Sequence, residues 1–243
     1  MTRLLLLAAV LAGIAGAVAP GSAGAAACPH WGRPAVAADP RPHALRVFAI
    51  QFRQHPAQMA TAADYRRAID CALRTEVLPH LATGRPNLVV FDEDIGLETI
   101  AVGPRGAAAR ALLQRGNGCT GDLCLTLATL GDINTGYGRA LTYLQHRFPA
   151  LANQLGRGSV AATDTFARVF MTTMATEARR HHLYIVASNT QAPFALTRNA
   201  AAVQALRDPG TPGVHSVYAP TAGVATSPSV LDRWLAQQAS SHK

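Results

Sequence analysis

The heptapeptide Asn87-Leu88-Val89-Val90-Phe91-Asp92-Glu93 carries the strongest structural signal in the sequence. Its apolar part is too short for a helix and lies between Pro86 and Asp92, which predicts a β-strand that is buried on both faces. The strand ends in an acidic cluster, residues 92–94. Carboxylates at the carboxyl end of a buried strand stand where α/β folds place their sites. We therefore expect a functional site at this end of the strand.

Similar elements flank this strand on both sides. Residues 45–52 alternate and are rich in β-branched and aromatic residues, which predicts a strand. Thr61 is the expected N-cap of an amphipathic helix that stops near Pro79. A second helix, with Thr163 or Asp164 as its N-cap, extends to residue 180, and Phe166, Phe170 and Met174 at four-residue steps form its expected core-facing stripe. The other expected elements are strands over 183–188 and near 214–217 and helices over 107–113, 137–148 and 231–239. Strands that alternate with helices predict an α/β fold with a layered sheet.

The N-terminus has the pattern of a secretory signal peptide. Arg3 precedes an apolar stretch, residues 4–19, which Pro20 and Gly21 interrupt and a run of small residues follows. The stretch is shorter than the roughly 20 residues that span a bilayer, so we expect no retained membrane span. We divide the chain into a signal peptide (1–27), a Pro-rich leader (28–44), one domain (45–226) and a tail (227–243). The expected location is secreted or extracytoplasmic.

The four cysteines are expected to form disulfides in an exported protein. Cys119 and Cys124 are close in sequence across a Gly-containing turn, which favours them as one pair and leaves Cys28 with Cys71. Four cysteines allow three connectivities, so this pairing is one of three. A lipid-modified Cys28 is the alternative, but it would leave an odd number of cysteines.

The composition excludes several classes of protein. Of the 243 residues, 49% are hydrophobic and 15% are charged, which excludes a disordered chain or a coiled coil. The formal net charge is +8, and Lys243 is the only Lys. Nucleic-acid binding typically shows clustered Lys and Arg with interleaved aromatic residues, a pattern that this sequence lacks. We expect no nucleic-acid partner.

His181 and His182 are the first residues to consider as metal ligands. Adjacent residues at a helix end point apart, so the two do not form a chelating pair, and cations are favoured near a helix C-terminus without any metal. We therefore expect neither a metal nor a cofactor.

Two separated segments share their order and pattern with a known family. One runs from the strand at 47–52 through the amphipathic helix to Phe91-Asp92-Glu93, and the other is the helix over 166–180 with the strand at 183–188. Together they resemble the nitrilase superfamily of carbon–nitrogen hydrolases, in which a strand ending in Phe-Pro-Glu carries the catalytic Glu. Asp92 stands where that family has Pro. The resemblance covers residues 46–225, with an insertion over about 103–159, and implies part of an α-β-β-α sandwich.

The resemblance implies three catalytic roles. In the family a Glu takes a proton from a Cys thiol, the thiolate attacks an amide or nitrile carbon, and a Lys stabilises the anionic tetrahedral species. Glu93 matches the first role, although by residue type alone it could cap a helix or lie solvated at the strand end. The other roles have no candidate, because Lys243 lies in the tail and no Cys follows Cys124.

Two interpretations follow. The first is an exported carbon–nitrogen hydrolase-like protein, truncated and inactive as given, whose substrate class is a small-molecule amide or nitrile. A truncated sandwich is expected to leave an incomplete sheet with an exposed apolar face or edge. The second is a secreted binding or structural protein that keeps the same fold without its chemistry.

Overall fold

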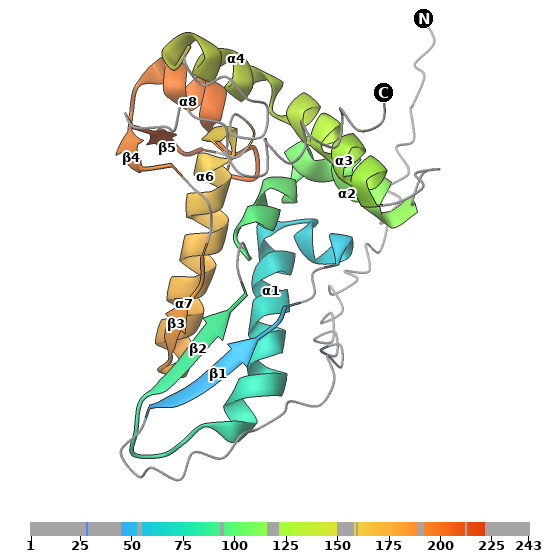
Figure 1. Cartoon of the computed structure of the whole chain (residues 1–243). Coiled ribbons are helices and arrows are strands. Elements are labelled where there is room, and N and C mark those ends of the chain that lie inside the picture. The colour runs from blue at the N-terminus through green and yellow to red at the C-terminus, as the bar shows by residue number, and fades with distance from the viewer. Residues whose placement is uncertain are drawn as a thin grey trace, which may run out of the picture.

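The central element of the fold is β2 (Asn87–Phe91). The computed structural model of the chain describes residues 28, 45–52, 55–92, 95–115, 122–149, 158, 160–188, 192–211 and 213–221. It places β2 between β1 (Arg46–Ile50) and β3 (Tyr184–Val186) in a three-stranded parallel sheet (Figure 1). The protein is therefore a mixed α/β protein, as predicted, and all three of these strands were expected from the sequence.

Two long helical stretches cover one face of this sheet (Figure 1). The first is α1 (Ala62–Ala72), which continues as a π-helical turn, Leu73–Val77. The second begins with α6 (Thr163–Phe166), passes through the π-helical turn Ala167–Met171 and ends with α7 (Thr172–His181). Both stretches were predicted as single helices.

Local signals explain where these helices begin and end. Thr61 is the N-cap of α1, and its Oγ1 accepts a hydrogen bond from the backbone N–H of Asp64 at 3.1 Å. The N-cap of α6 is Ala162 and not Thr163 or Asp164, so that prediction was one to two residues late. His182 ends α7 in the left-handed conformation, with a φ of 54°.

The strand register sorts the side chains of the sheet into two rows. Phe48, Val89 and Ile185 are cross-strand partners, and their row packs against the helices. The opposite row consists of Val47, Ala49, Leu88, Val90, Tyr184 and Val186.

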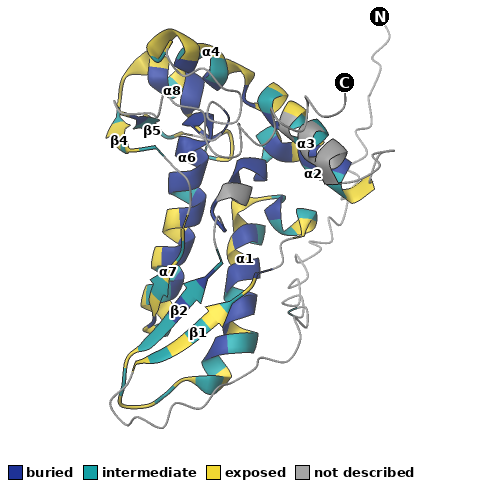
Figure 2. Ribbon diagram, in the orientation of Figure 1, coloured by how far each residue is buried: buried dark blue, intermediate teal, exposed yellow. Residues whose placement is uncertain are grey.

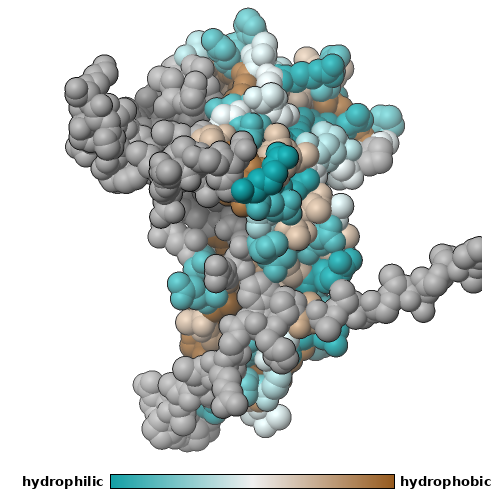
Figure 3. Space-filling model, turned by 90° about the vertical axis from the view of Figure 1, so that its right-hand side faces the viewer, coloured by the Kyte–Doolittle hydropathy of each residue, from teal (hydrophilic) through white to brown (hydrophobic). Residues whose placement is uncertain are grey.

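The opposite row forms an apolar face that no described element covers, and we call it the uncovered face. The exposed fractions of Val47, Tyr184 and Val186 are 54%, 65% and 53%. Figure 2 shows β1 in the colours of exposed and intermediate residues and β2 in the colours of intermediate and buried residues, with buried residues of α1 beside them. Figure 3 shows hydrophobic residues at the surface in the lower half of the molecule. The sheet thus has the exposed apolar face that was expected. The prediction that β2 is buried on both faces was wrong, because Leu88 and Val90 are only partly buried.

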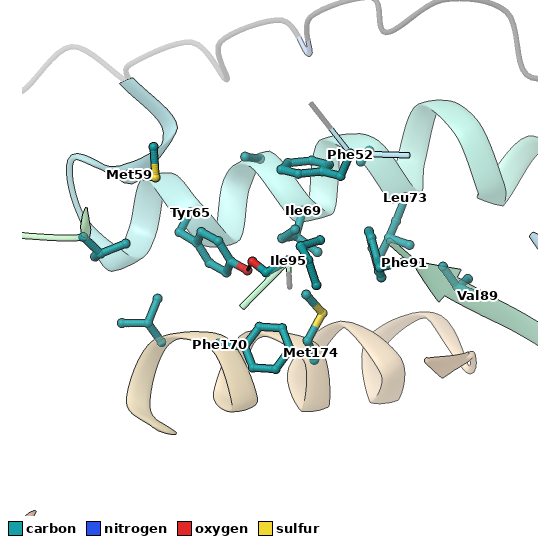
Figure 4. Packing of buried hydrophobic residues seen from close by; sticks show 14 of the residues in the cluster. Phe52, Met59, Tyr65, Ile69, Leu73, Val89, Phe91, Ile95, Phe170 and Met174 are labelled. Carbon is teal, nitrogen blue, oxygen red and sulfur yellow. Dashed lines mark hydrogen bonds between the residues drawn. The ribbon is translucent and has the colours of Figure 1, made fainter. Parts of the chain in front are cut away.

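The core lies between the sheet and the two helical stretches (Figure 4). Ile69 and Leu73 of the first stretch, both fully buried, face Phe170 and Met174 of the second. Phe166, which stacks on Phe170 with ring centroids 4.9 Å apart, completes the apolar stripe predicted at four-residue steps. The stripe is confirmed as part of the core.

A matched pair of valines tests the difference between the two faces of the sheet. Val89→Ala, on the covered face, is expected to lower the free energy of unfolding by roughly 2 kcal/mol, because a fully buried valine is truncated. Val186→Ala, on the uncovered face, is expected to change it by less than about 0.5 kcal/mol. Urea denaturation of both variants measures the difference, and equal losses would mean that both faces are covered.

The other described α-helices and β-strands lie beyond the carboxyl ends of the strands (Figure 1). They are α2 (Ala107–Arg115), α3 (Asp122–Gly136), α4 (Gly138–Arg147), α8 (Ala200–Leu206), β4 (Phe194–Thr197) and β5 (Val217–Pro220). The strands β4 and β5 pair antiparallel, and a second apolar cluster forms beside them. The sequence predicted α2, α4 and a strand near β5, but it did not predict α3, α8 or β4. In the described part of the chain, no helix is long and apolar enough to cross a membrane.

Candidate functional site

The segment that follows β2 is tied to the segments that follow both neighbouring strands. The backbone N–H of Asp92 donates to the carbonyl oxygen of Ile50 at 3.1 Å, and Oδ1 of Asp92 accepts from the N–H of Phe52 at 3.3 Å. On the other side, the N–H of Gly96 donates to the carbonyl oxygen of Ser188 at 3.4 Å. The carboxyl ends of all three parallel strands are therefore joined at one edge of the sheet, the usual place for a site in such folds.

Glu93, the predicted catalytic base, lies outside the described residues, as does Asp94. The described residues on either side of them are well anchored. Asp92 is bonded to the end of β1, and the carbonyl oxygen of the buried Ile95 accepts a hydrogen bond from the hydroxyl of Tyr65 in α1 at 3.2 Å. The role of Glu93 stays a prediction.

The other predicted site residues are also only partly described. Lys243 and Cys119 lie outside the described residues, and so does the side chain of Cys124 in α3. A disulfide joins Cys28 to Cys71, the pair that remains when Cys119 is matched with Cys124. An oxidised pair offers no thiolate, so neither Cys28 nor Cys71 can act as a nucleophile in this state.

A cluster of ionisable side chains that was not predicted from the sequence lies between α1 and α7. Glu177 of α7 is fully buried, and the side chains of His181 and of Asp70 in α1 are only 13% and 14% exposed. Nε2 of His181 lies 3.2 Å from Oδ1 of Asp70 and 3.3 Å from Oε2 of Glu177. We call these three residues the α1–α7 cluster.

Two arginines lie at the rim of the α1–α7 cluster. Nη1 of Arg180 is 3.3 Å from Oδ1 of Asp70 and 3.9 Å from Oε2 of Glu177, and Nη1 of Arg74 is 3.9 Å from Oδ2 of Asp70. Both arginine side chains are more than half exposed. Among the described residues, neither carboxylate oxygen of Glu177 has a hydrogen-bond partner. Burial, and next to it the charge of Asp70, raises the pKa of Glu177 above its ordinary value.

The spacing of Glu177 and His181 was visible in the sequence. Residues four apart share one face of a helix, but His181 was considered only with its neighbour His182, which is exposed and lies outside the cluster. Asp70 precedes His181 by 111 residues. No local pattern could have brought these two together.

The raised pKa of Glu177 predicts a pH dependence of stability. The native state binds this proton more tightly than the unfolded chain, so the free energy of unfolding is expected to fall as the pH rises from about 4.5 toward the folded-state pKa. Glu177→Gln removes this titration and leaves the facing ionisable side chains of Asp70, Arg180, His181 and Arg66 in place. Urea denaturation across this pH range compares the two proteins.

In this experiment the wild type is expected to lose stability relative to Glu177→Gln as the pH rises. Glu76→Gln, outside the cluster, is the control and is expected to follow the wild type. Parallel curves for the wild type and Glu177→Gln would contradict the prediction.

Asp164 is a second buried charge, and the protein itself satisfies its carboxylate. Oδ1 accepts from Nε of Arg168 and from the N–H of Tyr218, both at 2.9 Å, and Oδ2 accepts from the N–H of Asp208 at 2.8 Å. The carboxylate therefore joins α6 to β5 and to the segment after α8. We assign it a structural role, because its hydrogen bonds all run to other parts of the protein.

Comparison of the chain with models of protein families, with curated proteins and with solved structures finds no match. The functional assignment therefore depends on the residues and their arrangement.

Proposed function

We propose that the chain is an exported protein of the carbon–nitrogen hydrolase type, built on part of a nitrilase-like α-β-β-α sandwich. Glu93 is its general base, and a small-molecule amide or nitrile is its substrate class. The observation that supports this most is the position of the Asp92–Asp94 acidic cluster in the chain, directly after the central strand of a parallel sheet. Hydrogen bonds join Asp92 to Ile50 and Phe52 at the end of β1, and Gly96 to Ser188 after β3.

The uncovered face of the sheet supports the sandwich. In such a sandwich a second sheet covers the face that the helices leave free, and the covered face is apolar. The free row of this sheet consists of aliphatic residues and one tyrosine, with Val47, Tyr184 and Val186 more than half exposed. A monomeric protein rarely leaves such a row uncovered.

Two observations support export. The N-terminal residues have the order of a signal peptide, with Arg3 before the apolar stretch 4–19. The disulfide between Cys28 and Cys71 is typical of an oxidising compartment. N-terminal sequencing of the exported protein tests this part of the proposal, and the expected first residue lies near Cys28.

The chain as given is expected to be inactive in hydrolysis. A general base acts on a nucleophile, and the family's thiol has no counterpart after Cys124. The family's Lys stabilises the tetrahedral anion, and the only Lys here is Lys243. Arg does not replace Lys in such a pocket, because its planar head needs a different shape.

The sequence has no counterpart of the family's catalytic Cys and Lys. This favours a second candidate, a secreted binding or structural protein that keeps the fold without the chemistry. In that protein the row of Val47, Tyr184 and Val186 would be a surface for a partner. The two candidates differ in whether the chain, once completed by a segment that supplies the family's Lys and Cys, releases ammonia from an amide or nitrile.

The decisive experiment has two steps. The gene is sequenced beyond the codon of Lys243, and the chain is then expressed together with any reading frame that follows, in frame or shifted. A continuation that encodes a Lys segment and a Cys at a strand-to-helix turn is expected to release ammonia from simple amides or nitriles. Glu93→Gln is then expected to slow the reaction by about 10²–10⁴-fold, and Asp94→Asn is the matched control. Unrelated sequence there, or activity that survives Glu93→Gln, would contradict the proposal.

A further inference from the structure

We propose that the α1–α7 cluster, Asp70, Glu177 and His181, is a binding site for a divalent transition-metal ion of the Zn²⁺ type. This proposal is independent of the proposed hydrolase activity. The three residues offer one imidazole and two carboxylates, a set of ligands that Zn²⁺ accepts in proteins. One nitrogen and two oxygens from these residues lie within 4.8 Å of one another.

Two of the three distances between the ligand atoms fit one small ion, and the third, between the carboxylate oxygens of Asp70 and Glu177, is within 4.8 Å. Tetrahedral coordination with bonds of 2.0–2.1 Å separates neighbouring ligand atoms by about 3.3 Å. Nε2 of His181 lies 3.2 Å from Oδ1 of Asp70 and 3.3 Å from Oε2 of Glu177. Two edges of the tetrahedron are therefore present already, and the fourth position is left for water.

The burial of Glu177 gives a second and independent reason. Its side chain is fully buried, yet no residue in the described part of the chain forms a hydrogen bond with either of its carboxylate oxygens. One turn earlier on the same helix face, Oγ1 of Thr173 is also buried and has no hydrogen-bond partner in that part of the chain. Buried polar groups usually have a hydrogen-bond partner. Two buried side chains without one, a single helical turn apart, therefore indicate a ligand between α1 and α7.

The helices hold the ligands in place before any ion binds. Glu177 and His181 are four residues apart, so both project from the same face of α7. Asp70 comes from the facing helix α1, which packs against α7 through the core side chains Ile69 and Met174 (Figure 4). A site on two packed helices is more rigid than a site on loops.

Arg180 competes with the ion for the carboxylate of Asp70. Its Nη1 lies 3.3 Å from Oδ1 of Asp70, but its side chain is 57% exposed and can turn to solvent. Exposed ion pairs contribute at most about 1 kcal/mol, far less than coordination by three ligands. Arg180→Gln is therefore expected to tighten metal binding by up to about fivefold, because it removes this competing charge.

The test is titration of the full chain with Co²⁺, which replaces Zn²⁺ and gives visible absorption bands in tetrahedral sites. We expect one Co²⁺ per chain, displaced by Zn²⁺. Asp70→Asn and His181→Asn are each expected to weaken binding by more than about 100-fold, since even the residues behind metal ligands change affinity by 10–100-fold. His182→Asn is the matched control, because this neighbouring histidine is exposed and outside the cluster, and it is expected to leave binding unchanged.

X-ray absorption of the wild-type protein with Zn²⁺ gives a second measurement that needs no variant. The expected shell contains nitrogen and oxygen ligands with one imidazole. The proposal is overturned if the wild type shows no saturable binding, if binding survives both His181→Asn and Asp70→Asn, or if the shell contains sulfur or several imidazoles.

Discussion

Asp164→Ala is expected to lower the free energy of unfolding by about 3–5 kcal/mol, the cost of breaking a buried ion pair by removing one partner. The Asp164 carboxylate is fully buried and accepts three hydrogen bonds, from Arg168, Asp208 and Tyr218. Its loss leaves the Arg168 guanidinium without its carboxylate and two buried or partly buried N–H groups without an acceptor. Urea denaturation followed by circular dichroism measures the change.

Asp64→Ala is the matched control for this variant. Asp64 also pairs with an arginine on its own helix, Arg67 at 3.1 Å, but its side chain is 26% exposed and that of Arg67 is 58% exposed. The expected loss is at most about 1 kcal/mol. Similar losses for Asp64→Ala and Asp164→Ala would contradict the structural role that we assign to Asp164.

Cys28→Ser is expected to lower the free energy of unfolding by about 4 kcal/mol under oxidising conditions. The disulfide closes a loop with a sequence separation of 43 residues, and the estimate follows from the entropy that such a loop removes from the unfolded chain. Cys71 stays in the core as a buried thiol. Urea denaturation with and without a reductant compares the variant with the wild type.

The predicted short loop between Cys119 and Cys124 supplies the control. Cys124→Ser is expected to cost only about 2 kcal/mol, because a loop of a few residues loses less entropy on closure. Reduction is expected to destabilise the wild type more than it destabilises Cys28→Ser. Equal stability of the oxidised wild type and Cys28→Ser would show that the disulfide does not form.

The parts of the fold that could be predicted are those whose apolar residues follow one clear pattern along the sequence. The run ending in Phe91 predicted β2, and the four-residue spacing from Phe166 to Met174 predicted the helix that packs on α1. Sequence alone could not show that only one face of β2 is covered. That depends on what packs against the sheet, which an apolar run does not specify.

The missed elements had weak or misleading local patterns. The sequence of α3 has Leu at 123, 125 and 127, a strand-like alternation, and it follows a Gly-rich stretch. β4 spans four residues directly after Pro193, and α8 spans seven, too few for a clear period. In each case contacts in the second apolar cluster or with β5 decide the structure.

The candidate sites differ in the same way. The acidic segment after β2 was predictable because a single stretch contains both the strand and its carboxylates. The α1–α7 cluster combines residues from two helices. The spacing of Glu177 and His181 can be seen in the sequence, because both residues lie in α7. Its third member, Asp70, becomes a neighbour only when the helices pack.

Residues 160–181, which include α6 and α7, contribute to both apolar clusters. Residues 160–162, just before α6, lie in the second cluster, while Phe166, Phe170 and Met174 lie in the first. Figure 1 shows this stretch running from the level of α8 down to the sheet. Because this segment contributes side chains to both clusters, unfolding of one cluster disturbs the packing of the other. The described part of the chain should therefore unfold as one cooperative unit, in which a destabilising substitution in either cluster lowers the stability of both.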